Sequence, residues 1–352
     1  MRITKLREIM HKAGADAALI TSPVNVRYYS GFSGVSSQLL ITPDKKLFFT
    51  DFRYTEQAEA ETDFTVVETN GNERIKAIFE YAEKEGVKRI GADLSEISYY
   101  SYRSYLRHIS EEGLIDLSSE VSNQRSVKDE GEIELISKGA KHNDELFTHL
   151  CGLLKPGVSE TDIKAEIVYY MNRRGAETAF DPIVASGPNS SLPHATPTGK
   201  KIEAGDFVTI DYGCRFEGYC SDFTRTVAIS RIDKDMEKVY DIVNRAGEKA
   251  FEALKPGVMA RDVDAAARDH IAEAGYAESF GHGLGHGVGM FIHEAPTLNA
   301  LSDETLRPGM VVTIEPGIYL KGRYGVRIED LCVVTKDGFK NLTAAPREMI
   351  II

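Results

Sequence analysis

The chain has 352 residues, of which 42% are hydrophobic and 27% charged, a composition typical of a globular protein with room for two domains. The formal net charge is −12, which argues against a nucleic-acid partner, because phosphate binding needs clustered Lys and Arg. No apolar run approaches the roughly 20 residues that cross a membrane, and the N-terminal segment is amphipathic, unlike a signal peptide. We therefore expect a cytoplasmic protein without a membrane partner.

The first part of the chain alternates helical and strand patterns. Residues 3–13 have helical periodicity and end at a glycine, and residues 17–21 form a short apolar strand. Residues 38–42 and 46–50 are predicted to pair as strands across a Pro-Asp turn. The pattern predicts a mixed α/β domain over residues 1–122. This part holds no cluster of His with carboxylates, so we expect it to serve support, substrate shaping or association.

A second domain, residues 127–352, is predicted to begin with a long helix. Ser126 and Asp129 are both candidates for its N-cap, and acidic residues follow in the first turn. The tetrapeptide KPGV occurs at residues 155–158 and again at 255–258, each time before a helical pattern that ends at a glycine. We interpret this as an internal duplication, with two related halves facing each other across a pseudo-twofold axis.

Matching strand pairs in the two halves carry acidic residues. Asp211 and Asp222 are predicted on the two arms of one hairpin, and Glu315 and Glu329 occupy the same places on a second hairpin. Four like charges in an apolar sheet would repel and would be costly to desolvate. Two divalent cations would cancel them. The alternative is that the acids lie on solvated hairpin faces.

The candidate imidazole ligand lies in a glycine-rich segment that contains His282, His286 and His293. One imidazole among carboxylates favours manganese, cobalt, iron or zinc over calcium. His194 lies in residues 181–206, which are predicted to be a long turn-rich loop before the first acidic strand. Such loops commonly carry binding residues, although a loop histidine without a role is equally compatible with the sequence.

The order of these residues resembles a known family. Asp211, Asp222, His286, Glu315 and Glu329 follow one another like the five ligands of the dinuclear site in pita-bread metallopeptidases. The stretches SSLPHATP and GHGLGHGVGMFIHE are similar to the Xaa-Pro branch, prolidase and aminopeptidase P, and NVRYYSGFSG and TDFRYTEQA are similar to the creatinase-like N-terminal domain. The resemblance implies an α/β (α+β) chain, with a creatinase-like mixed α/β domain followed by a pita-bread catalytic domain with internal pseudo-twofold duplication.

The resemblance also implies how two divalent metal ions are held. Asp211 would chelate one ion, Asp222 and Glu329 would bridge both, and His286 and Glu315 would complete the shell of the other. Manganese is expected, with cobalt, zinc or iron as alternatives. A bridging water acidified by the ions would attack the scissile carbonyl, and Glu315 would also shuttle the proton.

Four further residues receive substrate roles from the same resemblance. His194 and His293 would hydrogen-bond the substrate carbonyl and stabilise the oxyanion. His282 would line the pocket. Arg327 would orient Glu329, which lies two residues further along the same strand.

The implied reaction is metal-dependent hydrolysis of the bond between an N-terminal residue and a following proline, in di- or oligopeptides. Prolidases often carry a basic residue shortly after the His-Glu pair, where this chain has Thr297. The choice between Xaa-Pro dipeptidase and aminopeptidase P therefore stays open. The alternatives are a methionine-aminopeptidase-like enzyme and a non-catalytic peptide-binding pita-bread protein. The resemblance also leads us to expect a homodimer.

Overall fold

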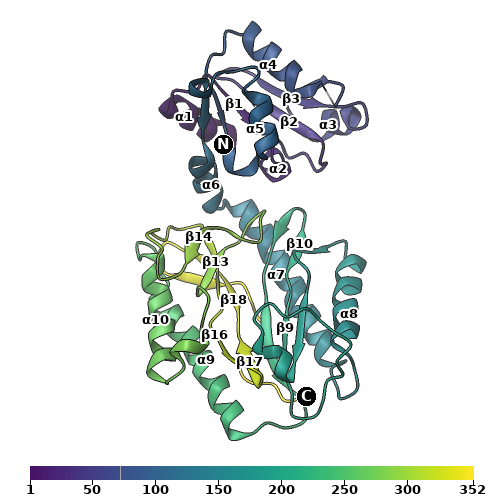
Figure 1. The fold of residues 1–352 in the computed structure, drawn as a ribbon, viewed down its shortest axis with the longest axis vertical. Coiled ribbons are helices and arrows are strands. Elements are labelled where there is room, and N and C mark those ends of the chain that lie inside the picture. The colour runs from purple at the N-terminus through teal and green to yellow at the C-terminus, as the bar shows by residue number, and fades with distance from the viewer. Residues whose placement is uncertain (72) are drawn as a thin grey trace. The chain divides into compact units, whose positions relative to one another are not determined.

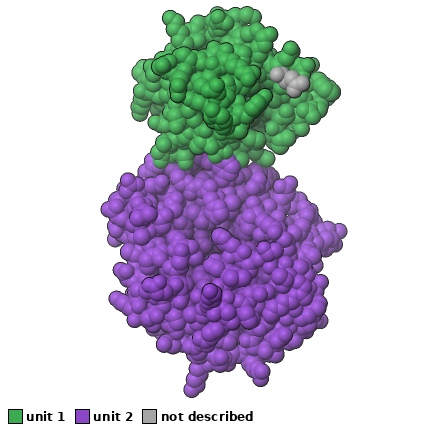
Figure 2. Space-filling view, viewed as in Figure 1, with its two compact units in different colours: residues 1–124 green, residues 125–352 purple. Residues whose placement is uncertain are grey.

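The computed structural model describes residues 1–71 and 73–352, and the chain separates into two compact units, Met1–Gln124 and Arg125–Ile352 (Figure 1). Figure 2 colours the first unit green and the second purple. Both units combine helices with sheets, as the sequence predicts. Among the described residues, no helix is both long enough and apolar enough to cross a membrane.

The first unit is built around one mixed sheet. Its six strands lie in the order β4-β3-β2-β1-β5-β6, and the pairs β3–β4, β1–β5 and β5–β6 are parallel. Buried Leu, Ile and Phe side chains of the strands form its core. The elements are α1 (Arg2–Ala13), β1 (Ala17–Ile20), α2 (Pro23–Ser30), β2 (Ser37–Ile41), β3 (Lys46–Thr50), α3 (Thr55–Glu61), β4 (Thr65–Glu68), α4 (Arg74–Lys84), β5 (Ile90–Ala92), η1 (Leu94–Glu96), α5 (Tyr99–Tyr105), η2 (Glu111–Gly113), β6 (Leu114–Asp116) and α6 (Ser118–Ser126).

Helix α2 is not predicted by the local sequence pattern, because it is short and rich in aromatic and β-branched residues. Its burial explains why it forms. Val26 and Tyr29 lie in the core, and Asn25 Nδ2 donates a 2.7 Å hydrogen bond to Asp93 Oδ2. Pro23 suits the first turn, where its missing N–H costs no helical hydrogen bond.

The second unit contains the two halves suggested by the sequence repeat. Its elements are α7 (Glu130–Cys151), α8 (Glu160–Arg173), β7 (Glu177–Thr178), β8 (Ile183–Ser186), η3 (Gly187–Ser191), β9 (Phe207–Asp211), β10 (Cys214–Phe216), β11 (Tyr219–Cys220), β12 (Thr224–Ala228), α9 (Lys234–Ala253), α10 (Ala260–Glu273), η4 (Ala277–Ser279), β13 (Gly285–Gly287), β14 (Glu294–Leu298), β15 (Val311–Ile314), β16 (Gly317–Leu320), β17 (Tyr324–Arg327), β18 (Asp330–Val334) and β19 (Phe339–Asn341). In Figure 1, α7 and α8 lie beside the strands of the first half, and α9 and α10 beside those of the second.

The two halves match in detail, which confirms the duplication. Each has a helix pair packed against its own strands, and a buried apolar cluster forms around each helix pair. Helices α8 and α10 are followed by Gly175 and Gly275, which both have positive φ. Before each helix a glycine N–H binds a distant carbonyl, in one half Gly157 to Ile202 and in the other Gly257 to Leu306.

The structure corrects one local prediction and decides between the two alternatives of another. Residues 181–206 are not loop throughout, because Ile183–Ser186 forms β8 and pairs with β9. This strand is short and lies between Pro182 and Gly187, so its pattern is weak, and pairing with β9 supplies the stability. At the start of α7, Asp129 is the N-cap, and its carboxylate and the Glu132 side chain form a capping box.

Candidate active site and metal centre

The two strand pairs bring four carboxylates to one cavity of about 950 Å³. Asp211 ends β9 opposite Thr224 of β12, and Asp222 lies two residues before β12. In the second half Glu315 directly follows β15, and Glu329 directly precedes β18. The duplicated sheet ends therefore place matching acids on both sides of the cavity, and all four line it.

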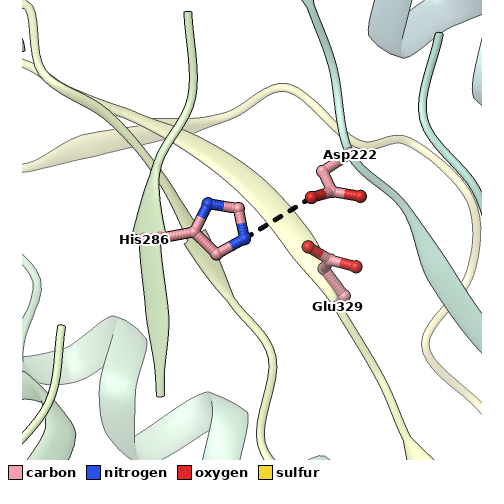
Figure 3. A group of neighbouring side chains, drawn as sticks. All are labelled: Asp222, His286 and Glu329. Carbon is pink, nitrogen blue, oxygen red and sulfur yellow. Dashed lines mark ion pairs between the residues drawn. The ribbon is translucent and has the colours of Figure 1, made fainter. Parts of the chain in front are cut away.

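His286 supplies an imidazole between these acids. Its Nε2 atom lies 3.5 Å from Asp222 Oδ2 and 3.3 Å from Glu315 Oε1. Figure 3 shows His286, Asp222 and Glu329 pointing toward one another from three strands or strand ends. The Nδ1 atom lies 3.1 Å from the Gly287 carbonyl, which can only accept, so Nδ1 carries a proton and Nε2 faces the carboxylates.

Close backbone packing around His286 explains the glycines beside it. A Cβ on Gly285 would lie 2.1 Å from the Thr313 carbonyl oxygen, and a Cβ on Gly287 would lie 2.3 Å from that of Ala295. Strand β13 can therefore fit between β14 and β15 only with glycine at both positions. The backbone N–H of His286 donates to Thr313 Oγ1, which in turn donates to Glu315 Oε1.

The donor set fits divalent cations. Ligand atoms of Asp222, His286 and Glu329 all lie within 4.8 Å of one another. Glu329 Oε2 accepts from Thr224 Oγ1 at 2.7 Å, whereas its Oε1 is buried and has no hydrogen-bond partner among the described residues. A buried carboxylate oxygen without a partner is costly unless a cation binds it. Oxygen ligands with one imidazole suit manganese, cobalt, iron or zinc.

The pKa shifts of the acids also indicate a cation site. Burial raises the pKa of Asp222 and of Glu329 well above the usual carboxyl range, and repulsion between the acids raises it further. Burial also raises the pKa of Glu315, but the hydrogen bond and charge of His286 outweigh it and lower that pKa to about 2. Bound cations would offset the repulsion and allow all the carboxylates to ionise together.

Arg327 contacts different partners from those predicted. Its guanidinium pairs with Asp211 Oδ2 rather than with Glu329, and its Nε donates to Thr224 Oγ1 at 3.3 Å. The link to Glu329 therefore runs through the Thr224 hydroxyl. Sequence spacing placed Arg327 and Glu329 on one strand, but Arg327 ends β17 and Glu329 lies in the link to β18.

The substrate histidines line the same cavity. The rings of His293 and His286 are 4.3 Å apart at their centroids and nearly perpendicular. His282 Nε2 lies 2.9 Å from the hydroxyl of Tyr319, which also accepts a 2.8 Å hydrogen bond from Arg327 Nη1. His194 is exposed and lies three residues after the end of η3. Tyr319 is not predicted from the sequence, because only the folded β16–β17 pair brings it to His282 and Arg327.

A buried ion cluster lies next to His293 and is also absent from the sequence prediction. The Glu294 carboxylate is 2.7 Å from Lys128 Nζ and 3.3 Å from Arg125 Nη2. All three side chains are almost fully buried. Glu294 Oε2 also accepts from the backbone N–H of Phe291 at 3.4 Å. The cluster therefore attaches the segment before His293 to the start of the second unit.

Comparison with known proteins identifies the chain. Residues 134–336, more than half of its length, match metallopeptidase family M24. The chain belongs to this family. Residues 2–127 of this M24 metallopeptidase match the Creatinase/Prolidase N-terminal domain. Both halves of the resemblance drawn from the sequence motifs are thereby confirmed.

Several full-length relatives carry Xaa-Pro names. This M24 metallopeptidase is 37% identical to the Xaa-Pro dipeptidase of Pyrococcus horikoshii, and the alignment covers 99% of this chain and 98% of the relative. The structure of an Xaa-Pro dipeptidase from Bacillus anthracis matches with a TM-score of 0.96 at 39% identity, covering 100% and 99% of the two chains. The X-Pro aminopeptidase from Thermotoga maritima matches with a TM-score of 0.91 at 37% identity, covering 98% and 100%.

Proposed function

We propose that this M24 metallopeptidase hydrolyses the peptide bond between an N-terminal residue and a following proline. The observation that carries the proposal is one cavity that combines four carboxylates and His286 with three more imidazoles, those of His194, His282 and His293. Three relatives that align over nearly their whole length are named as Xaa-Pro dipeptidases or an X-Pro aminopeptidase. An Xaa-Pro bond has no N–H group. A site that binds its carbonyl oxygen therefore suits it better than a site that needs a backbone N–H donor from the substrate.

The five residues Asp211, Asp222, His286, Glu315 and Glu329 would hold two divalent cations, with manganese expected and cobalt, zinc or iron as alternatives. When bound, the cations would lower the pKa of a shared water and polarise the scissile carbonyl. Glu315 would carry the proton from the attacking water to the departing proline nitrogen, because its Oε1 faces the cavity beside His286.

His293 and His194 would bind the substrate carbonyl. Partial burial and the neighbouring His286 lower the pKa of His293, so its ring is neutral near pH 7 and can donate one hydrogen bond. Burial also lowers the pKa of His282, whose Nδ1 is directed at the Gly283 carbonyl, so that ring serves to line the pocket. A donor aimed at a developing oxyanion contributes about 3 kcal/mol in comparable sites.

The charges of the cavity do not favour a dipeptide over a longer peptide. Among the described residues that line it, Arg327 is the only lysine or arginine, and its guanidinium is occupied by Asp211, Thr224 and Tyr319. Thr297, also on the cavity wall, carries no charge. None of the described residues of the cavity wall therefore offers a free lysine or arginine to bind the carboxylate of an Xaa-Pro dipeptide.

Chelation combined with proline peptides tests the reaction. The protein should hydrolyse Ala-Pro-Ala with Mn²⁺ or Co²⁺, lose activity after exhaustive chelation and regain it when metal is restored. Cleavage of Met-Ala-Ser without cleavage of Ala-Pro-Ala would favour a methionine-aminopeptidase-like enzyme. Binding without hydrolysis of any peptide by the metal-loaded protein would favour a peptide-binding protein.

A homodimer in the cytoplasm belongs to the same proposal. Sedimentation tests the oligomeric state, and cell fractionation tests the location.

A matched peptide series tests substrate length. We expect similar kcat/KM for Ala-Pro, Ala-Pro-amide and Ala-Pro-Ala, and a large loss for acetyl-Ala-Pro-Ala, whose ammonium group is blocked beside the acidic end of the cavity. Rates are measured at equal metal loading. A preference for Ala-Pro over Ala-Pro-Ala of about 100-fold would contradict this and indicate a dipeptidase.

A further inference from the structure

A buried carboxylate closes the base of the segment that carries His194. Glu160 begins α8 and has no exposed surface. Its Oε1 accepts from the backbone N–H of Ser186 at 2.8 Å, from the Ser186 hydroxyl at 2.9 Å and from Asn189 Nδ2 at 3.0 Å. Its Oε2 accepts from the backbone N–H and the hydroxyl of Thr198, at 2.9 and 2.8 Å. One side chain thus ties together the two ends of residues 186–198, which we call the His194 arm.

The side of the His194 arm is held by the β16–β17 hairpin. The backbone N–H of Gly325 donates to Ser190 Oγ at 2.9 Å, and that of Gly322 donates to Ser191 Oγ at 3.2 Å. The arm is also braced internally, because the Ser191 hydroxyl donates to the Pro188 carbonyl at 2.7 Å. These bonds fix the middle of the arm against the half of the unit that supplies Glu315 and Glu329.

The tip of the His194 arm reaches the candidate metal ligands. Arg327 Nη1 donates to the Pro193 carbonyl at 3.1 Å, while Nη2 of the same guanidinium pairs with Asp211. His194 follows Pro193 directly, and both line the cavity. The exposed His194 ring therefore takes its position from contacts made elsewhere in the arm.

Glu160 holds the two ends of the His194 arm together as an ionised carboxylate. Burial raises its pKa, but the hydrogen bonds from Thr198, Ser186 and Asn189 outweigh burial and lower the pKa below its usual value. Charge-assisted hydrogen bonds of this kind are stronger and more directional than neutral ones. A glutamine at position 160 would place an NH₂ group where one carboxylate oxygen now accepts hydrogen bonds. The donors that bind this oxygen would lose their acceptor, so even an isosteric change would disturb the two ends of the His194 arm.

We propose that Glu160 is a positioning residue for His194, because it closes the base of the arm and so holds the tip over the cavity as a fixed element rather than a mobile lid. This inference rests on the proposed peptidase function only where it predicts a loss of kcat/KM. Its structural consequence, a rigid arm, can be measured on the protein without substrate. A displacement of about 1 Å at a group that binds the substrate carbonyl is enough to reduce the rate strongly.

Glu160→Gln is the primary variant, and Glu166→Gln on the same helix is its matched control. Among the described residues, Glu166 contacts the exposed His149 through one ion pair at the protein surface. In Glu160→Gln we expect amide hydrogen exchange in residues 187–197 to be faster by about tenfold, with bound metal and the exchange of α9 unchanged. We expect kcat/KM on Ala-Pro-Ala to fall by about tenfold or more, mainly through kcat, and Glu166→Gln to behave like the parent protein.

A double-mutant cycle with His194→Ala separates positioning from general destabilisation. If Glu160 acts through His194, Glu160→Gln should reduce kcat/KM by less than about twofold in the His194→Ala background. An equal loss in both backgrounds, or unchanged exchange of the arm, would overturn the proposal. If Glu160→Gln does not fold, Asn189→Ala and Thr198→Val weaken the same contacts more mildly and should show the same pattern. A parent protein inactive on proline peptides would reject the proposed function, while the exchange measurement would still decide the role of Glu160.

Discussion

Asp222 and His293 lie on the same cavity, yet their removal should have different effects. Asp222 belongs to the cluster that could hold metal, whereas the exposed His293 ring packs against His286. We expect Asp222→Asn to lose both bound metal and activity. His293→Ala should keep most of its metal and lose about 100-fold in kcat. Metal analysis and steady-state kinetics on the two purified variants check this, and normal metal content in both variants with similar rates would show that the roles are wrongly assigned.

The buried Lys128–Glu294 pair gives a prediction about stability. The two side chains are 1% and 3% exposed, so removal of one leaves the charge of the other without full compensation. We expect Lys128→Met to lower the free energy of unfolding by about 3 kcal/mol. Lys138→Met is the control, because Lys138 and its partner Glu134 are half exposed or more, and it should cost less than about 0.5 kcal/mol. Urea denaturation measures both, and equal costs would contradict the prediction.

At the scale of elements, strand β13 depends on its lack of side chains next to His286. A methyl group at Gly285 would meet the Thr313 backbone at 2.1 Å, so the strand would have to move away from β15. We expect Gly285→Ala to weaken metal binding by about tenfold or more and to reduce activity accordingly. The control is Gly338→Ala, where nothing lies within 4 Å of the added methyl. Wild-type metal affinity in Gly285→Ala, measured by titration, would refute the argument.

At the scale of the whole molecule, the candidate ligands join the two halves of the second unit. Asp211 and Asp222 belong to the first half, and His286, Glu315 and Glu329 to the second. Metal should therefore stabilise the unit as a whole. At about 100 times its Kd, Mn²⁺ should add about 2.7 kcal/mol to the free energy of unfolding, seen as a higher Tm than in the chelated protein. An unchanged Tm at saturating Mn²⁺ would argue against this link between the halves.

The sequence by itself determined the two-part α/β plan, the duplication and the order of the acids. Asp211, Asp222, Glu315 and Glu329 are recognisable because each lies at or within two residues of the end of a strand with a strong β pattern, and because the pattern occurs twice. Periodicity is a local property of the sequence, so it can be recognised without knowledge of the fold. The family resemblance rests on the same local motifs.

Only the tertiary structure decided which side chains meet. Helix α2 and strand β8 have weak local patterns and form because burial and pairing with β9 stabilise them. Tyr319 and Glu160 gain their importance from partners far away in the chain, Tyr319 from His282 and Glu160 from Thr198. Arg327 contacts Asp211 because β17 packs against β9, and spacing along one strand does not predict this contact. Hydrogen bonds over such separations depend on how the sheets pack, and packing is a property of the whole chain.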